Sequence, residues 1–132
     1  MRFAYRRWFL AALVYNLTWG ISVVVYPRWF LAFTELGDTA APLAQGIGMM
    51  VAVYGYGYYL VAREPGRYRG YVWIALAGKT FGAVGFVYCA LAGTLPWRFA
   101  FQTCINDLIW FPAFWSFLLT GRGERPGGDR IE

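Results

Sequence analysis

Two charged residues of opposite sign lie inside long apolar stretches, and their side chains are the ones best placed to do chemistry. Lys79 lies in the run 71–93, and Asp107 lies in the run 99–119. A charge in hydrocarbon costs roughly 3 kcal/mol on insertion scales, so such residues normally pair, line a wet cavity or carry function. The sequence therefore predicts that the ammonium and the carboxylate face each other across two neighbouring helices.

Three interpretations of this pair are open. In the first, Lys79 and Asp107 form a buried ion pair that fixes helix register with help from Asn106, and loss of one partner is costly. In the second, Asp107 titrates and alternates between a proton and Lys79 during transport. In the third, the pair binds a small lipophilic or anionic molecule. No catalytic residue can be named, because no serine lies beside a base and no phosphate-binding loop is present.

The composition indicates a small integral membrane protein. Of 132 residues, 59% are hydrophobic and 14% are charged, whereas a soluble domain carries about 25% charged residues. The net charge is +5. Nucleic-acid binding needs a basic face on a soluble fold, which this apolar sequence does not offer, so we expect no nucleic-acid partner. Histidine is absent, which excludes histidine-based metal and haem sites, and we expect neither a metal nor a cofactor.

The cysteines give no sign of redox or metal chemistry. Cys89 and Cys104 lie in separate apolar runs and form no CxxC motif. We expect both to be buried and reduced. A disulfide would require their helices to align near the outer surface.

Four apolar runs are long enough to cross a bilayer, which takes about 20 helical residues. Their approximate bounds are 8–26, 43–62, 71–93 and 99–119. The sequence thus predicts one all-α, multi-pass membrane domain over 1–132, an up-down bundle of four transmembrane helices. The stretch Trp29–Phe33 predicts either a short interfacial helix or an ordered loop packed over the bundle. Residues 121–132 are expected to form a disordered tail.

Arginine is distributed unevenly between the two predicted sides of the membrane. One side receives nine arginines, and the other receives only Arg28 and Arg98. Because basic residues favour the cytoplasmic side, both termini are expected in the cytoplasm.

Helical periodicity indicates which faces point inward. In the fourth run, one arc holds the polar residues and Trp110, and it must face protein because lipid offers polar groups no partners. Asn16 and Tyr54 lie near the predicted depth of Lys79, whereas Gln45 and Gln102 lie higher. Together these residues form the predicted polar centre or ligand-binding site: Lys79, Asp107, Asn106, Asn16, Gln45, Gln102, Tyr54 and Trp110.

Small residues and one proline predict how the helices pack. Small residues let helix backbones approach closely, and they recur along three of the runs. The stripes are Ala12, Asn16 and Gly20, then Gly48, Ala52 and Gly55, then Ala75, Gly78, Gly82 and Gly85. Pro112 lacks an N–H, so the fourth run is expected to kink near it.

The motif residues also carry a resemblance. The third and fourth runs resemble a GK…G…P…NDxxW pattern of small bacterial four-helix membrane proteins. The matching residues are Gly78-Lys79, Gly82, Gly85, Pro96 and the run from Asn106-Asp107 to Trp110. In size and topology the chain is similar to the DoxX-like four-helix proteins. The resemblance implies a bacterial inner-membrane location and implies no particular activity.

The leading functional expectation is a non-enzymatic membrane protein, either an accessory subunit or a binder of a lipophilic ligand. The aromatic residues could line a site for a quinone or an isoprenoid. The lipid bilayer is the expected surrounding, and a homo-oligomer or a larger membrane complex is compatible with it. The alternatives are a proton-coupled small-solute transporter or channel, with Asp107 titrating, and an intramembrane enzyme.

Overall fold

The computed structural model describes residues 2–120, with side chains from residue 5 onward, and this part of the chain is all-helical. Its helices are α1 (Arg2–Val25), α2 (Arg28–Thr34), α3 (Ala41–Arg63), α4 (Arg69–Leu91), α5 (Phe99–Asn106) and α6 (Phe111–Thr120). Short 3-10 turns occupy Asp38–Ala40 and Leu108–Trp110. The predicted tail 121–132 lies outside the described residues.

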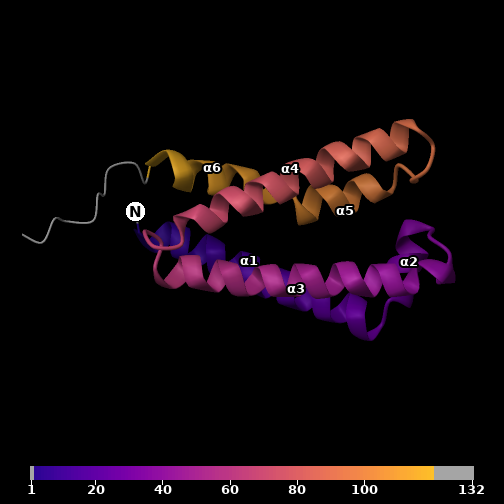
Figure 1. Cartoon of the computed structure of the whole chain (residues 1–132), viewed down its shortest axis with the longest axis horizontal. Helices are drawn as coiled ribbons and strands as arrows, with labels where there is room; N and C mark the ends of the chain where they lie inside the picture. The colour runs from indigo at the N-terminus through magenta and orange to yellow at the C-terminus, as the bar shows by residue number, and fades with distance from the viewer. Residues whose placement is uncertain (1, 121–132) are drawn as a thin grey trace, which may run out of the picture.

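The chain runs back and forth along one axis, as the up-down prediction requires (Figure 1). α1 and α3 lie side by side, and α4 lies beside α5 and α6 (Figure 1). One end of the molecule holds the start of α1, the connection from α3 to α4 and the end of α6. The opposite end holds α2 and the turn from α4 to α5 (Figure 1).

Two helices, Tyr5–Val25 and Arg69–Leu91, are long and apolar enough to cross a membrane, judged by length and composition. α3 has 23 residues, but its glycines, tyrosines and Gln45 make it less apolar. The fourth predicted span, 99–119, is not one helix, because a 3-10 turn separates α5 from α6. The predicted kink near Pro112 is therefore present as an interruption that begins at Asp107.

The closest helix packing joins α1 to α3 through glycine. A Cβ atom built on Gly20 would lie 2.5 Å from the carbonyl oxygen of Gly48 and 2.8 Å from the backbone nitrogen of Ala52. The two backbones therefore touch at this crossing, as the small-residue stripes of the first and second runs predict. The glycines of α4 behave differently. Within the described residues, Gly85 has nothing within 4 Å of its built Cβ, and Gly82 faces a side chain instead of a backbone.

Two hydrophobic clusters lie at opposite ends of the molecule. The first packs the aromatic rings of Phe9, Tyr58 and Phe114 together at the arginine-rich end, with centroid separations of 5.3–6.3 Å. The second packs Phe30 and Leu31 of α2 against the ends of α1 and α3. The predicted short helix at Trp29–Phe33 is thus present as α2, and it is packed over the bundle through its buried face.

The outer surface of the bundle is apolar along the middle of its helices. Many large hydrophobic side chains are exposed there, including Val14, Leu17, Met50, Val53, Phe81 and Val84. Within residues 5–120, the charged side chains other than Lys79 and Asp107 lie near helix ends or in connections. Apart from Lys79 and Asp107, charge within the described residues is therefore concentrated toward the ends of the helices.

Candidate functional site

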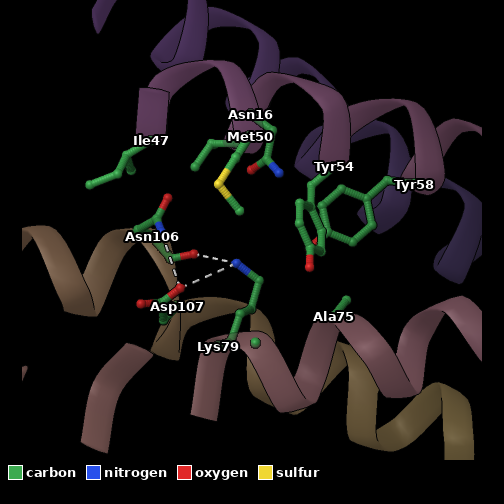
Figure 2. Close-up of a pocket in the computed structure, with 11 residues that line it drawn as sticks. Asn16, Ile47, Met50, Tyr54, Tyr58, Ala75, Lys79, Asn106 and Asp107 are labelled. Atoms are coloured by element: carbon green, nitrogen blue, oxygen red, sulfur yellow. Dashed lines mark hydrogen bonds and ion pairs between the residues drawn. The ribbon is translucent and has the colours of Figure 1, made fainter. Parts of the chain in front are cut away.

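The two charges meet at mid-height of the bundle. The Lys79 ammonium lies 3.5 Å from Asp107 Oδ1 and donates a hydrogen bond to the backbone carbonyl of Asn106 at 2.5 Å (Figure 2). The Asn106 side-chain amide donates to the same Asp107 oxygen at 3.0 Å. Lys79 is 7% exposed and Asp107 is 9% exposed. The predicted pairing across neighbouring helices is present as a buried salt bridge.

A break in the helix supplies the second acceptor for Lys79. At the start of the 3-10 turn, the N–H of Trp110 donates to the carbonyl of Asp107 at 3.3 Å. In an α-helix that N–H would bond to the carbonyl of Asn106, four residues back. The Asn106 carbonyl is instead oriented toward Lys79 and accepts its hydrogen bond. Pro112 lies in the first turn of α6, where proline is tolerated and a preceding break is favoured.

A glycine makes room for the carboxylate. A Cβ atom built on Gly82 would lie 3.3 Å from Asp107 Oδ2, tighter than most contacts of this kind. The missing side chain lets Asp107 lie directly against α4. Gly82 is therefore part of the site through its small size.

Two cavities flank the pair. Cavity 1 has a volume of about 260 Å³ and lies between α3 and α4 beside the Lys79 ammonium (Figure 2). Cavity 2 has a volume of about 150 Å³ and lies toward α2. Cavity 1 is lined by Asn16, Ile47, Met50, Val51, Tyr54, Tyr58, Ala75, Gly78, Lys79, Asn106 and Asp107. Cavity 2 is lined by Trp19, Phe30, Ile47, Gly82, Phe99, Gln102, Thr103, Asn106 and Asp107.

Buried polar atoms without protein partners gather around these cavities. Buried polar groups are normally hydrogen-bonded, yet several here have no partner within the described part of the chain. They are Tyr15 Oη, Asn16 Oδ1, Trp19 Nε1, Tyr58 Oη, Gln102 Nε2, Asn106 Oδ1 and Trp110 Nε1. Asn16 and Tyr58 line cavity 1, and Trp19 and Gln102 line cavity 2. Asn106 lines both cavities. Within the described residues, both cavities are therefore bordered by polar side chains as well as by apolar ones.

The predicted site residues are only partly brought together. Asn16 and Tyr54 line cavity 1 with the pair, and Gln102 lines cavity 2. Gln45 lines neither cavity, and its amide donates to the carbonyl of Val24 at 2.8 Å, which ties α3 to the end of α1. Trp110 is buried outside both linings, where its ring packs against Trp8 and Tyr15.

The sequence reasoning missed Trp19 and Met50 as lining residues. Trp19 lies three residues after Asn16 and so shares its helix face, which is a signal that could have found it. Met50 carries no such signal, because a thioether in an apolar run is usually part of a core. Tyr58 belongs to the tyrosine cluster of α3, whose rings are among the aromatic residues expected to line a ligand site.

One cysteine departs from expectation. Cys89 and Cys104 are both free, Cys89 is partly buried and Cys104 is exposed. The prediction that both are buried is therefore wrong for Cys104. It lies on the face of α5 opposite the polar arc, the face that carries the apolar outer surface.

No family model, curated protein or solved structure matches this chain. The function is therefore proposed from the site itself.

Proposed function

We propose that this protein is a small integral membrane protein that crosses the bilayer four times and holds a lipophilic ligand against the Lys79–Asp107 pair. The apolar outer surface supports the membrane location, because water would solvate side chains such as Phe81, Val84 and Leu91 poorly. The two more apolar helices, α1 and α4, would cross the bilayer. α3, and α5 together with α6, would cross it beside them. The break at Asp107 is compatible with a membrane because the Asn106 carbonyl that it frees accepts a hydrogen bond from Lys79.

The proposed orientation places both termini in the cytoplasm of a bacterial inner membrane. The end that holds the start of α1 and the connection from α3 to α4 carries Arg6, Arg7, Arg63 and Arg67, whereas the opposite end carries Arg28 and Arg98. Basic side chains accumulate on the cytoplasmic side of membrane proteins. The bacterial assignment rests on the resemblance of the GK…NDxxW pattern.

Cavity 1 is the single observation that carries the ligand proposal. It is a mostly apolar and aromatic pocket with a small number of polar groups at one place, which is the usual character of small-molecule sites. A purely structural ion pair would be expected to pack without adjacent space, because interiors are close-packed. The space beside Lys79 is therefore best explained by an occupant.

Wild-type protein purified from membranes in a mild detergent is expected to carry a bound lipophilic molecule. The test is organic extraction of the purified protein followed by mass spectrometry. The double variant Lys79→Met/Asp107→Leu should retain much less, because a hydrogen bond to a charged group contributes about 1.5–3 kcal/mol, or at least about tenfold in affinity.

The matched control removes an ion pair that lies far from the cavity. Arg67 and Glu64 form an exposed pair with 70% and 52% of their side-chain surface accessible. The variant Arg67→Met/Glu64→Leu should retain the wild-type amount of ligand. Equal losses in both double variants, or wild-type protein with no bound molecule, would contradict the proposal. Co-purification of other membrane proteins in its place would favour an accessory subunit.

A second candidate function, proton-coupled transport, is favoured by the position of Asp107. Its carboxylate lines both cavities, and these lie on different sides of the charge pair. A titrating group between two spaces could receive a proton from one and release it to the other.

In liposomes, transport predicts proton uptake driven by an imposed membrane potential, which a trapped pH-sensitive dye reports. Asp107→Asn should remove most of this uptake from the fraction of protein that remains monodisperse, because asparagine keeps the hydrogen-bonding shape but cannot ionise. Asp38→Asn, at an exposed residue outside both cavity linings, should leave the uptake unchanged. Absence of uptake in the wild type would exclude proton conduction through the protein by itself.

A further inference from the structure

Cavity 1 has a mouth on the outer face of the bundle between α3 and α4. Its deep wall is made by buried residues, Asn16, Tyr58 and Ala75. Its outer rim is made by Ile47 and Met50 of α3, which are 43% and 63% exposed, and by the exposed Gly78 of α4. Met50 and Lys79 lie on opposite sides of the space in Figure 2.

The two helices come together at their connection and diverge toward α2 (Figure 1). Near the connection, Tyr71 of α4 packs over Gly57 of α3 and donates a hydrogen bond to the carbonyl of Tyr54 at 2.6 Å. Beyond that contact, Gly78 offers no side chain to close the space. The mouth is therefore bounded by a tight contact on the connection side, and its rim includes the flexible Met50 and the side-chain-free Gly78.

The height of the mouth decides which phase it opens to. Met50 is near the middle of α3 (Ala41–Arg63), and Gly78 is near the middle of α4 (Arg69–Leu91). Ten residues of helix on each side correspond to about 15 Å, roughly half the hydrocarbon thickness of about 30 Å. In a spanning bundle the mouth faces acyl chains and neither aqueous phase.

The charges of the cavity restrict the ligand head. The charged side chains in its lining are Lys79 and Asp107, whose charges cancel, so a net charge on the ligand would face one of them unfavourably. An ammonium has three N–H donors. One donates to the Asn106 carbonyl, and the salt bridge to Asp107 Oδ1 at 3.5 Å occupies at most a second. The third is available to an oxygen acceptor.

The shape of the cavity restricts the ligand further. The rings of Tyr54 and Tyr58 form one wall (Figure 2), and aromatic rings favour flat partners. The volume of about 260 Å³ is just below the range of about 300–1,000 Å³ for sites that enclose a whole ligand. The cavity therefore suits a head group whose apolar chain extends through the mouth.

We infer that the ligand is a neutral, flat, carbonyl-bearing ring with one apolar tail, a quinone-type lipid, and that it reaches Lys79 directly from the bilayer through the mouth between α3 and α4. This inference rests on the proposed function, since it takes cavity 1 to be a ligand site in a membrane. It adds the ligand class and the route.

The test uses the full-length protein in phospholipid nanodiscs that contain a benzoquinone with a single decyl chain. Native mass spectrometry measures the fraction of protein that carries the quinone across a range of mole fractions. Gly78→Leu should weaken binding about tenfold, equivalent to about 1.4 kcal/mol, because its side chain fills the mouth. A Cβ at Gly78 would be 3.9 Å from the Tyr54 hydroxyl, an ordinary contact that preserves the fold.

Gly85→Leu is the matched control. Gly85 is also an exposed glycine of α4, but it lines neither cavity and its built Cβ meets nothing within 4 Å. Met50→Trp and Met49→Trp form a second such pair, since both methionines are exposed and only Met50 lines cavity 1. The control variants should bind quinone as the wild type does, and Met50→Trp should bind it more weakly.

The outcomes separate the inference from the proposed function. Equal quinone binding by Gly78→Leu and Gly85→Leu would overturn the route while leaving the ligand site intact. Tighter binding of decyl phosphate or decyltrimethylammonium than of the quinone would overturn the neutral head. No binding of any of the three probes to the wild type would overturn the proposed ligand function itself.

Discussion

Removing one member of the charge pair is expected to destabilise the protein more than removing both. Lys79→Met leaves a buried carboxylate without its cation, and Asp107→Leu leaves a buried ammonium without its anion. Each single variant should lose about 3–5 kcal/mol, since an uncompensated buried charge is strongly unfavourable. The measurement is the midpoint of thermal unfolding in detergent, together with the monodisperse fraction on gel filtration.

The double variant Lys79→Met/Asp107→Leu should recover much of this loss, but not all of it. It leaves the Asn106 carbonyl without the Lys79 donor, and an unsatisfied buried acceptor costs about 1–3 kcal/mol. Arg67→Met is the control for loss of a cation. It breaks an exposed ion pair with Glu64, and such pairs contribute at most about 1 kcal/mol. A double variant as unstable as the worse single variant would show that the two charges are not energetically coupled.

Gly20→Ala is expected to force α1 and α3 apart. The added methyl would lie 2.5 Å from a carbonyl oxygen and 2.8 Å from a backbone nitrogen of α3. Backbone atoms cannot rotate away as a side-chain end can, so the helices must shift. Overpacking of this kind costs about 1–3 kcal/mol and occasionally more. The thermal midpoint of the variant in detergent should fall accordingly.

Gly46→Ala provides the comparison within the same helix pair. Gly46 is in α3, and a Cβ built on it meets nothing within 4 Å. Alanine is favoured over glycine in a helix by about 1 kcal/mol, so this variant should be neutral or slightly stabilised. If Gly20→Ala were equally well tolerated, the backbone contact between α1 and α3 would not be as close as described.

Periodicity predicted the inward faces of the first and fourth runs well, because a helix places residues at about 100° intervals whatever its surroundings. It was wrong for the third run, where Gly78, Gly82 and Gly85 are exposed. In the fourth run, Gln102, Thr103 and Asp107 are buried, whereas Leu108 and Ile109 are exposed. The meeting of Lys79 with Asp107 followed from the same reasoning combined with a short connection. These features depend on local spacing and on the cost of an isolated charge.

Other features depend on how closely the helices approach, which spacing does not encode. Glycines on α1 and α3 bring backbones together, while the similar stripe on α4 does not. The cavity beside Lys79 exists because α3 and α4 diverge, and no sequence motif predicts that divergence. Spacing alone also places Gln45 in the polar centre. Its amide instead donates a hydrogen bond to the carbonyl of Val24 and does not reach the Lys79–Asp107 pair.

The placement of the charges within the fold also bears on how a ligand could be admitted. Lys79 belongs to α4 and Asp107 to the junction of α5 and α6, so both lie in the same half of the molecule. Across the cavity, α1 and α3 contribute neutral side chains to the lining. A change in spacing between the two halves would widen the cavity without pulling the ammonium away from the carboxylate. The pocket can therefore become larger while the two opposite charges stay together. The free-energy cost of separating them is avoided.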